Sequence, residues 1–132
     1  MPGSYTVTMV SGVPVVTAPP EIDSGNADAL RTVILDTMAH GHATFVVDMT
    51  ATGFCDSAGL HALLRAHRRA RAEGGEARLV ITSSAVLRIF AITGVDRLIP
   101  NFATVPEAVA PAPAVIVPPP RLGSPEPADP TR

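Results

Sequence analysis

The sequence predicts a single α/β domain in which a mixed sheet of four or five strands carries helices packed on one face. Two β-branched runs near the N-terminus, joined by a short turn, predict an antiparallel pair. Farther along, short apolar runs alternate with segments of helical apolar spacing, a pattern typical of parallel βαβ units. The 132 residues, of which 46% are hydrophobic, are enough for one buried core.

The first two strands are predicted by apolar and β-branched runs at residues 5–10 and 13–18. Ser11-Gly12 separates these runs, and a two-residue connection of this kind is typical of a β-hairpin. Pro14 can donate no ladder hydrogen bond, so it predicts that the second strand lies at a sheet edge or contains a bulge.

A helix and a central strand are predicted next. Apolar residues recur at helical spacing from Leu30 to Met38 and predict an amphipathic helix that ends near His40-Gly41. Residues 44–49 form a short, nearly all apolar run bounded by turn residues, which indicates a central strand covered on at least one face.

Two further helices flank another predicted strand at residues 78–82. The first starts at Ser57, keeps its arginines largely opposite its apolar side and ends at Gly74-Gly75. The second starts at a cap, Ser83 or Ser84, and stops at Gly94. Its predicted buried stripe consists of Val86, Ile89, Phe90 and Thr93.

The C-terminal part divides into the end of the domain and a tail. Residues 99–102 predict a short edge strand, and residues 105–110 predict a short last helix. Residues 111–132 hold 8 of the 14 prolines, with no aromatic residue and no helical period, so they cannot bury enough apolar surface to fold. We therefore expect a domain at 1–110 and a disordered proline-rich tail at 111–132.

Composition argues against a nucleic-acid-binding protein, a membrane protein and a disulfide-stabilised secreted protein. A net charge of −2 gives no general attraction to nucleic acid or to an anionic membrane. Cys55 is the only cysteine, which excludes an internal disulfide, and no apolar run approaches the roughly 20 residues that span a bilayer. With no secretory leader pattern at the N-terminus, the sequence predicts a cytoplasmic protein.

Residues 52–60 form the main candidate functional segment, because they place the hydroxyl of Ser57 at the start of a predicted helix. The first backbone amides of a helix lack intrahelical partners and lie at the positive end of the macrodipole. A phosphate on Ser57 would meet hydrogen-bond donors and a favourable field there. Gly59 adds a place where another backbone, such as a kinase loop, could approach closely.

Two other interpretations of Ser57 remain open at this stage. Either Ser57 or Asp56 could simply cap the helix, which stabilises it by roughly 1 kcal/mol. A serine hydrolase is disfavoured, because the nucleophile elbow needs glycine two residues before the serine and this chain has Cys55 there.

Arginine, histidine and cysteine residues could form partner-binding, metal or redox sites. The arginines at 65, 68, 69 and 71 form a basic helix face that could meet an acidic partner, although such faces are usually only solvated. The four histidines have no cysteine or carboxylate at ligand spacing, so no metal site is predicted. Cys55 could have a lowered pKa near a helix N-terminus or could be a buried, inert thiol.

The run Asp56-Ser57-Ala58-Gly59-Leu60 resembles the Asp-Ser-(Ser/Thr/Ala)-Gly-Leu signature of STAS domains, especially those of anti-sigma factor antagonists. The resemblance covers about residues 5–110 and implies the STAS fold. Further residues match the family in the same order along the chain: Glu21-Ile22-Asp23, Val46 to Met49, Gly75 to Ile81, and Ser84 through Val95.

This resemblance implies an anti-sigma factor antagonist in which Ser57 is the phosphorylation site. Its partners would be an anti-sigma factor with serine kinase activity, which binds the unphosphorylated form, and a PP2C-type phosphatase. It implies a monomer or weak dimer with no catalytic residue and no cofactor. The expected partner-binding residues are Glu21, Asp23, Asp56, Ser57, Ala58, Gly59 and Leu60.

A second function within the same family stays open. The domain could be a STAS scaffold or sensor, for instance a stressosome-like component or a lipid-transport accessory subunit, in which Ser57 only caps a helix. The sequence cannot separate the two, because they differ in whether a serine kinase recognises this surface.

Overall fold

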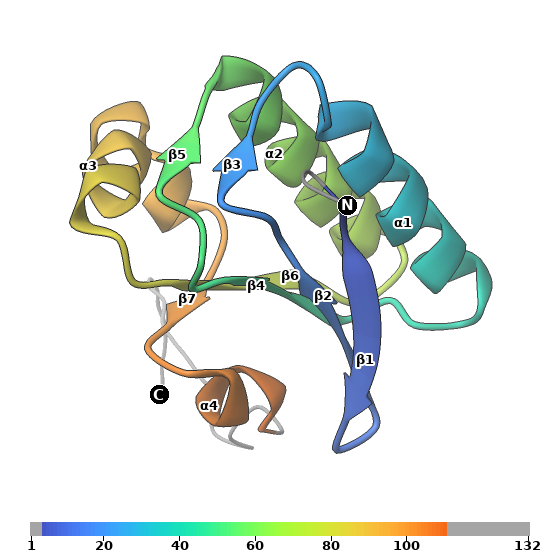
Figure 1. Ribbon diagram of the computed structural model, residues 1–132. Coiled ribbons are helices and arrows are strands. Elements are labelled where there is room, and N and C mark those ends of the chain that lie inside the picture. Colours follow the sequence, from blue (N-terminus) through green and yellow to red (C-terminus); the bar gives the residue numbers. More distant parts are fainter. Residues whose placement is uncertain (1–3, 111–132) are drawn as a thin grey trace, which may run out of the picture.

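The computed structural model describes residues 4–110 and shows a five-stranded mixed sheet with helices on both sides (Figure 1). The predicted tail, 111–132, lies outside the described residues. The strand order is β1-β2-β4-β6-β7, with β1 antiparallel to β2 and the other neighbours parallel. The strands of this sheet are β1 (Thr6–Val10), β2 (Val13–Thr17), β4 (Phe45–Met49), β6 (Ala77–Ile81) and β7 (Asn101–Phe102).

The helices lie in two layers. Three of them cover one face of the sheet: α1 (Ala27–Ala39), α2 (Ser57–Ala72) and α3 (Ser84–Thr93). The short helix α4 (Val105–Val109) covers the opposite face, as Figure 1 shows below the sheet. The predicted mixed α/β sheet is confirmed, and the single helical face holds for α1, α2 and α3 but not for α4.

The hairpin of β1 and β2 forms as predicted, but β2 is not at an edge. Ser11 and Gly12 have φ of 53° and 80°, the left-handed conformation that a type I′ hairpin turn needs. Pro14 lies in an inner strand between β1 and β4, so the predicted edge position was wrong. It is tolerated because the parallel ladder with β4 begins only at Val15, one residue later.

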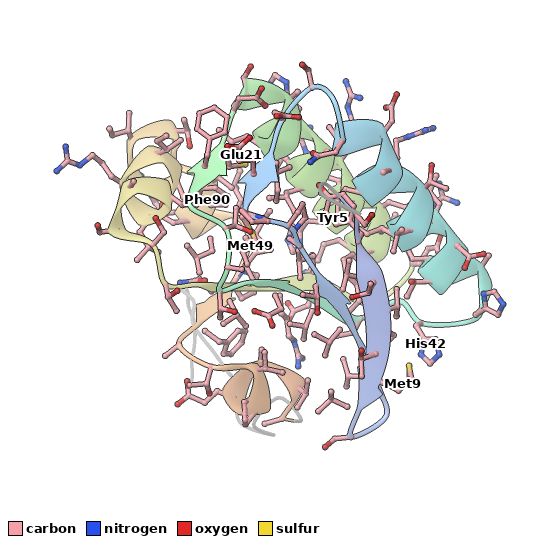
Figure 2. The ribbon with its side chains drawn as sticks, viewed as in Figure 1. Tyr5, Met9, Glu21, His42, Met49 and Phe90 are labelled. Carbon is pink, nitrogen blue, oxygen red and sulfur yellow. The ribbon has the colours of Figure 1, made fainter. Side chains whose placement is uncertain are left out.

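The larger core fills the space between the sheet and α1, α2 and α3. Met49 on β4 and Phe90 on α3 both lie in it (Figure 2). Within α3, Ser83 is the N-cap and Gly94 ends the helix with φ of 82°. Ile89 and Thr93 of the predicted buried stripe are exposed, because α3 packs through only the narrow strip of Val86 and Phe90.

A smaller core lies between the sheet and α4. Val15, Val46 and Val80 pack there against Ala108 and Val109. Arg78 on β6 is almost buried on this side, and its guanidinium donates to the carbonyl oxygens of Ala108 and Ala110, at 3.0 and 3.1 Å. A cation is favourable at a helix C-terminus, so Arg78 fastens α4 to the sheet.

Candidate functional site

A small parallel sheet above the main one positions the predicted site. It consists of β3 (Glu21–Ile22) and β5 (Phe54–Cys55), which pair with Glu21 opposite Phe54 and Ile22 opposite Cys55. The pairing places the loop that leads into α1 beside the start of α2 (Figure 1). We call the loop Asp23–Asn26, strands β3 and β5, and the first turn of α2 the Ser57 rim.

Asp56 is the N-cap of α2 and joins the two halves of this rim. Its Oδ1 accepts a hydrogen bond from the Gly59 amide at 3.1 Å, and its Oδ2 accepts one from the Ser24 amide at 3.3 Å. Its own amide donates to the carbonyl oxygen of Ile22 at 3.1 Å. The capping interpretation therefore applies to Asp56 and not to Ser57.

Ser57 is the first residue of α2, and its side chain is exposed. Within residues 4–110, its hydroxyl makes no hydrogen bond, and the amides of Ser57 and Ala58 donate to no acceptor. The hydroxyl is accessible, and two unsatisfied donors at a helix N-terminus lie beside it.

Gly59 and Leu60 belong to the interior and not to the accessible surface. A Cβ on Gly59 would lie 2.7 Å from Cγ2 of Ile22 and 2.8 Å from Sγ of Cys55, so only glycine lets α2 pack this closely on β3 and β5. Leu60 is 8% exposed and packs in the larger core. The approach that Gly59 permits is therefore made by Ile22 of the same chain, and neither residue offers a side chain to a partner.

The loop of the rim is held by side chains that bond to backbone. The Asp23 carboxylate accepts from the Gly25 amide at 2.9 Å. Asn26 donates to the carbonyl oxygen of Glu21 at 2.8 Å and accepts from the Asp23 amide at 3.0 Å. The Tyr5 hydroxyl donates to the same Asn26 amide oxygen at 3.1 Å, and burial, with smaller effects of Cys55 and Asp23, raises the pKa of Tyr5.

The Glu21 side chain is exposed on β3, at the edge of the small sheet (Figure 2). Asp23 is partly buried because its carboxylate folds back onto the loop. The predicted residues accessible in this structure are thus Glu21, Asp23, Asp56, Ser57 and Ala58.

The model of the STAS domain family matches residues 4–108, nearly all of the described chain. The chain belongs to the STAS domain family. An anti-sigma factor antagonist from Mycobacterium paratuberculosis has a similar solved structure, with 30% identity and a TM-score of 0.73 over 80% of this chain and 90% of that one. No curated protein sequence matches the chain significantly.

Two solved structures of the antagonist SpoIIAA share the STAS fold with this domain. The unphosphorylated form is 23% identical, with a TM-score of 0.69 over 80% of this chain and 93% of that one. The phosphorylated form, from Bacillus, is also 23% identical, with a TM-score of 0.64 over 80% and 96%.

Cys55 of this STAS domain is a core residue. It is 1% exposed, and burial, with a smaller effect of the Asp56 carboxylate, raises the pKa of its thiol to about 12. The idea of a lowered thiol pKa was therefore wrong: the thiolate that redox chemistry needs is strongly disfavoured.

Neither a metal centre nor a catalytic triad is found in the part of the STAS domain that the structure describes. No three His, Cys, Asp or Glu side chains within residues 4–110 gather as metal ligands. In that range no histidine bonds to the Ser57 hydroxyl, and both Asp56 oxygens accept from backbone amides. His67 accepts from the Ala77 amide at 3.2 Å on the buried side of α2. None of the helices at residues 4–110 is long and apolar enough to cross a membrane.

Three residues of the rim, Ser24, Asn26 and Phe54, are not evident from the sequence. The bonds from Ser24 to Asp56 and from Tyr5 to Asn26 join residues 32 and 21 positions apart, so no local pattern reveals them. The other Asn26 bonds, to Glu21 and Asp23, are local. Phe54 is 49% exposed on β5, three residues before Ser57. An aromatic residue two positions before the Asp56-Ser57 pair could have drawn attention, but its exposure depends on the pairing of β3 with β5.

Proposed function

We propose that this STAS domain is an anti-sigma factor antagonist controlled by phosphorylation of Ser57. Unphosphorylated, it binds an anti-sigma factor that is also a serine kinase, and the sigma factor is released to transcription. Phosphorylation of Ser57 ends this binding, and a PP2C-type phosphatase restores it. The main support for the proposal is the exposed Ser57 hydroxyl, which has no hydrogen bond within residues 4–110. The residues of the rim around it are held by hydrogen bonds.

The free amides beside Ser57 support the phosphorylated state. A phosphate brings about 1.5 to 2 negative charges and three strong acceptor oxygens. The amides of Ser57 and Ala58 can donate to it without breaking any bond within residues 4–110, because Asp56 caps the helix through Gly59 instead. The modified chain would therefore keep its fold while its surface changes.

The neighbouring acids explain how the phosphate would break an interface. Asp56 adjoins Ser57, and Glu21 and Asp23 lie on the same rim. A partner that packs over these carboxylates must supply cations or donors to them, and extra negative charge between them adds repulsion and a desolvation cost. The same surface can thus be bound before phosphorylation and rejected afterwards.

Phe54 gives this surface an apolar anchor. Its ring is half exposed next to Glu21, and aromatic side chains, Phe included, are enriched at the buried centre of interfaces. In this proposal, the domain binds its partners and catalyses no reaction of its own. It acts in the bacterial cytoplasm, where transcription takes place.

Phosphate transfer is tested by intact mass after incubation with ATP and each anti-sigma kinase of the source organism. The wild type should gain one phosphate, and Ser57→Ala should gain none. Ser84→Ala is the matched control, because Ser84 is likewise an exposed first residue of a helix, α3. If no kinase modifies the wild type, or if Ser57→Ala is modified equally, the phosphoswitch is wrong and the domain is a constitutive binding module.

A further inference from the structure

A groove runs between α1 and α2, which lie side by side on one face of the sheet (Figure 1). It consists of two adjoining hollows of about 270 and 140 Å³ that share Arg31, Ala62 and Arg65 in their walls. The larger hollow reaches Ala58, next to Ser57, and the smaller one extends to Met38 near the end of α1. The groove is therefore continuous with the Ser57 rim.

The groove has an apolar floor. On the α2 side it is lined by Ala58, Ala62 and Ala66, whose short side chains leave the space open. On the α1 side, Ile34 and Leu35 line it. Such a floor accepts an apolar side chain from a segment that lies along the two helices.

The walls of the groove are positively charged. Arg31 on α1 and Arg65 on α2 are exposed and line both hollows. Within residues 4–110 neither forms an ion pair, whereas Arg69, at the far end, pairs with Glu73 at 2.7 Å. His61 also lines the larger hollow, and Asp28 is the one acid among the lining residues. This excess of cations contrasts with the net charge of −2 for the whole chain.

We propose that this groove binds an acidic, amphipathic segment of the anti-sigma partner. Two carboxylates of the segment would pair with Arg31 and Arg65, and an apolar side chain between them would rest on the floor at Ala62. The segment would then hold the partner's kinase site over Ser57, which adjoins the end of the groove. This inference rests on the proposed function and adds the chemistry by which the partner is selected.

Charge complementarity favours this occupant over the others. The arginines are fixed on facing helices, so they select carboxylates at a matching separation, which a free anion does not offer. A second copy of the chain would need to bring its own acids, and a dimer through the groove would show in solution as a change of mass.

The test measures the affinity of the wild type and three variants for the anti-sigma kinases of the source organism by calorimetry. Arg31→Glu/Arg65→Glu should weaken binding by about 30-fold or more, since close charge pairs at interfaces couple strongly. Ala62→Leu, which fills the floor without changing charge, should also weaken binding by about tenfold. Arg88→Glu/Arg97→Glu changes net charge equally at exposed positions outside the groove, and it should bind like the wild type.

The outcomes separate this inference from the proposed function. Intact binding by both groove variants would overturn the inference alone. A loss that is equal in the Arg88/Arg97 control would also overturn it, because only overall charge would then matter. A groove variant that changes the oligomeric mass of the free chain would show that a second copy occupies the groove. No binding by the wild type to any anti-sigma factor would overturn both. Thermal melting shows whether each variant is folded. If Arg31→Glu/Arg65→Glu does not fold, Ala62→Leu still tests the groove.

Discussion

The starts of α2 and α3 have the same local design but different surroundings. Each has a capping side chain that accepts from the third amide of the helix, Asp56 from Gly59 at 3.1 Å and Ser83 from Val86 at 3.3 Å. Each cap is followed by an exposed serine. Within residues 4–110, only the cap of α2 also bonds to a distant segment, through the Ser24 amide.

This difference is why we propose Ser57, and not Ser84, as the phosphorylation site. The start of α2 lies next to the β3–α1 loop, the small sheet and the α1–α2 groove. A partner that contacts Ser57 can therefore contact several elements around it as well.

Gly59→Val should destabilise the domain by about 3 kcal/mol, at the upper end for overpacking, because Ile22 and Cys55 already lie where its Cβ would be. The third residue of α3 is the buried Val86, so the same side chain is accommodated there. Chemical denaturation measures the change. Gly53→Val is the control, since no atom of residues 4–110 lies within 4 Å of its added Cβ, and a similar loss in that control would refute the steric explanation.

Asp56→Ala should lower the free energy of unfolding by about 2 kcal/mol, the upper end of the range for removal of an N-cap. Ser83→Ala should lower it by about 1 kcal/mol, the typical value. The extra loss at Asp56 comes from the Ser24 bond that fastens the loop. Hydrogen exchange should show faster exchange at Ser24 only in the Asp56 variant. Equal costs and unchanged exchange would mean that the second bond contributes nothing.

Ser84→Asp should stabilise the domain by about 0.5 kcal/mol through the macrodipole of α3. Ser57→Asp should give less, because its new carboxylate lies beside Asp56. Thermal melting of the two variants compares them directly. A larger gain at Ser57 than at Ser84 would contradict the electrostatic account of the rim.

His67, in the body of α2, should contribute to the pH dependence of the domain's stability. Burial lowers its pKa below the ordinary 6.5, so the folded state holds the neutral ring while the unfolded chain takes up a proton. The stabilisation is complete above pH 6.5 and is lost as the pH falls through the lower, folded pKa. His67→Gln, which keeps an acceptor for Ala77, should flatten stability measured between pH 7.5 and 5. An unchanged slope would assign the dependence to other groups.

Much of the fold could be predicted from local patterns. The hairpin, the helix from Ser57 and the cap and stop of α3 follow from turn chemistry and helical spacing, which act over a few residues. The inner position of β2 could not be predicted, because Pro14 is tolerated only through the point where β4 begins to pair. The placement of α4 on the opposite face depends on Arg78, whose partners lie 30 and 32 residues away.

The sequence could point to a candidate site but could not show which of its residues are accessible. The segment from Asp56 to Leu60 identified the location, yet sequence alone could not tell that its last two residues are buried. That distinction depends on how closely α2 approaches Ile22. Asn26 and Phe54 acquire their roles only from the pairing of β3 with β5 and the bonds across the loop.

The most direct test of the central claim compares the affinity of the anti-sigma factor for two forms of this domain, with serine or genetically encoded phosphoserine at position 57. Calorimetry should show binding of the serine form and a loss of about 100-fold for the phosphoserine form, as expected when uncompensated charge enters an interface. Phosphoserine at position 84 should leave the affinity unchanged. Equal affinity of the two forms at position 57 would contradict the account.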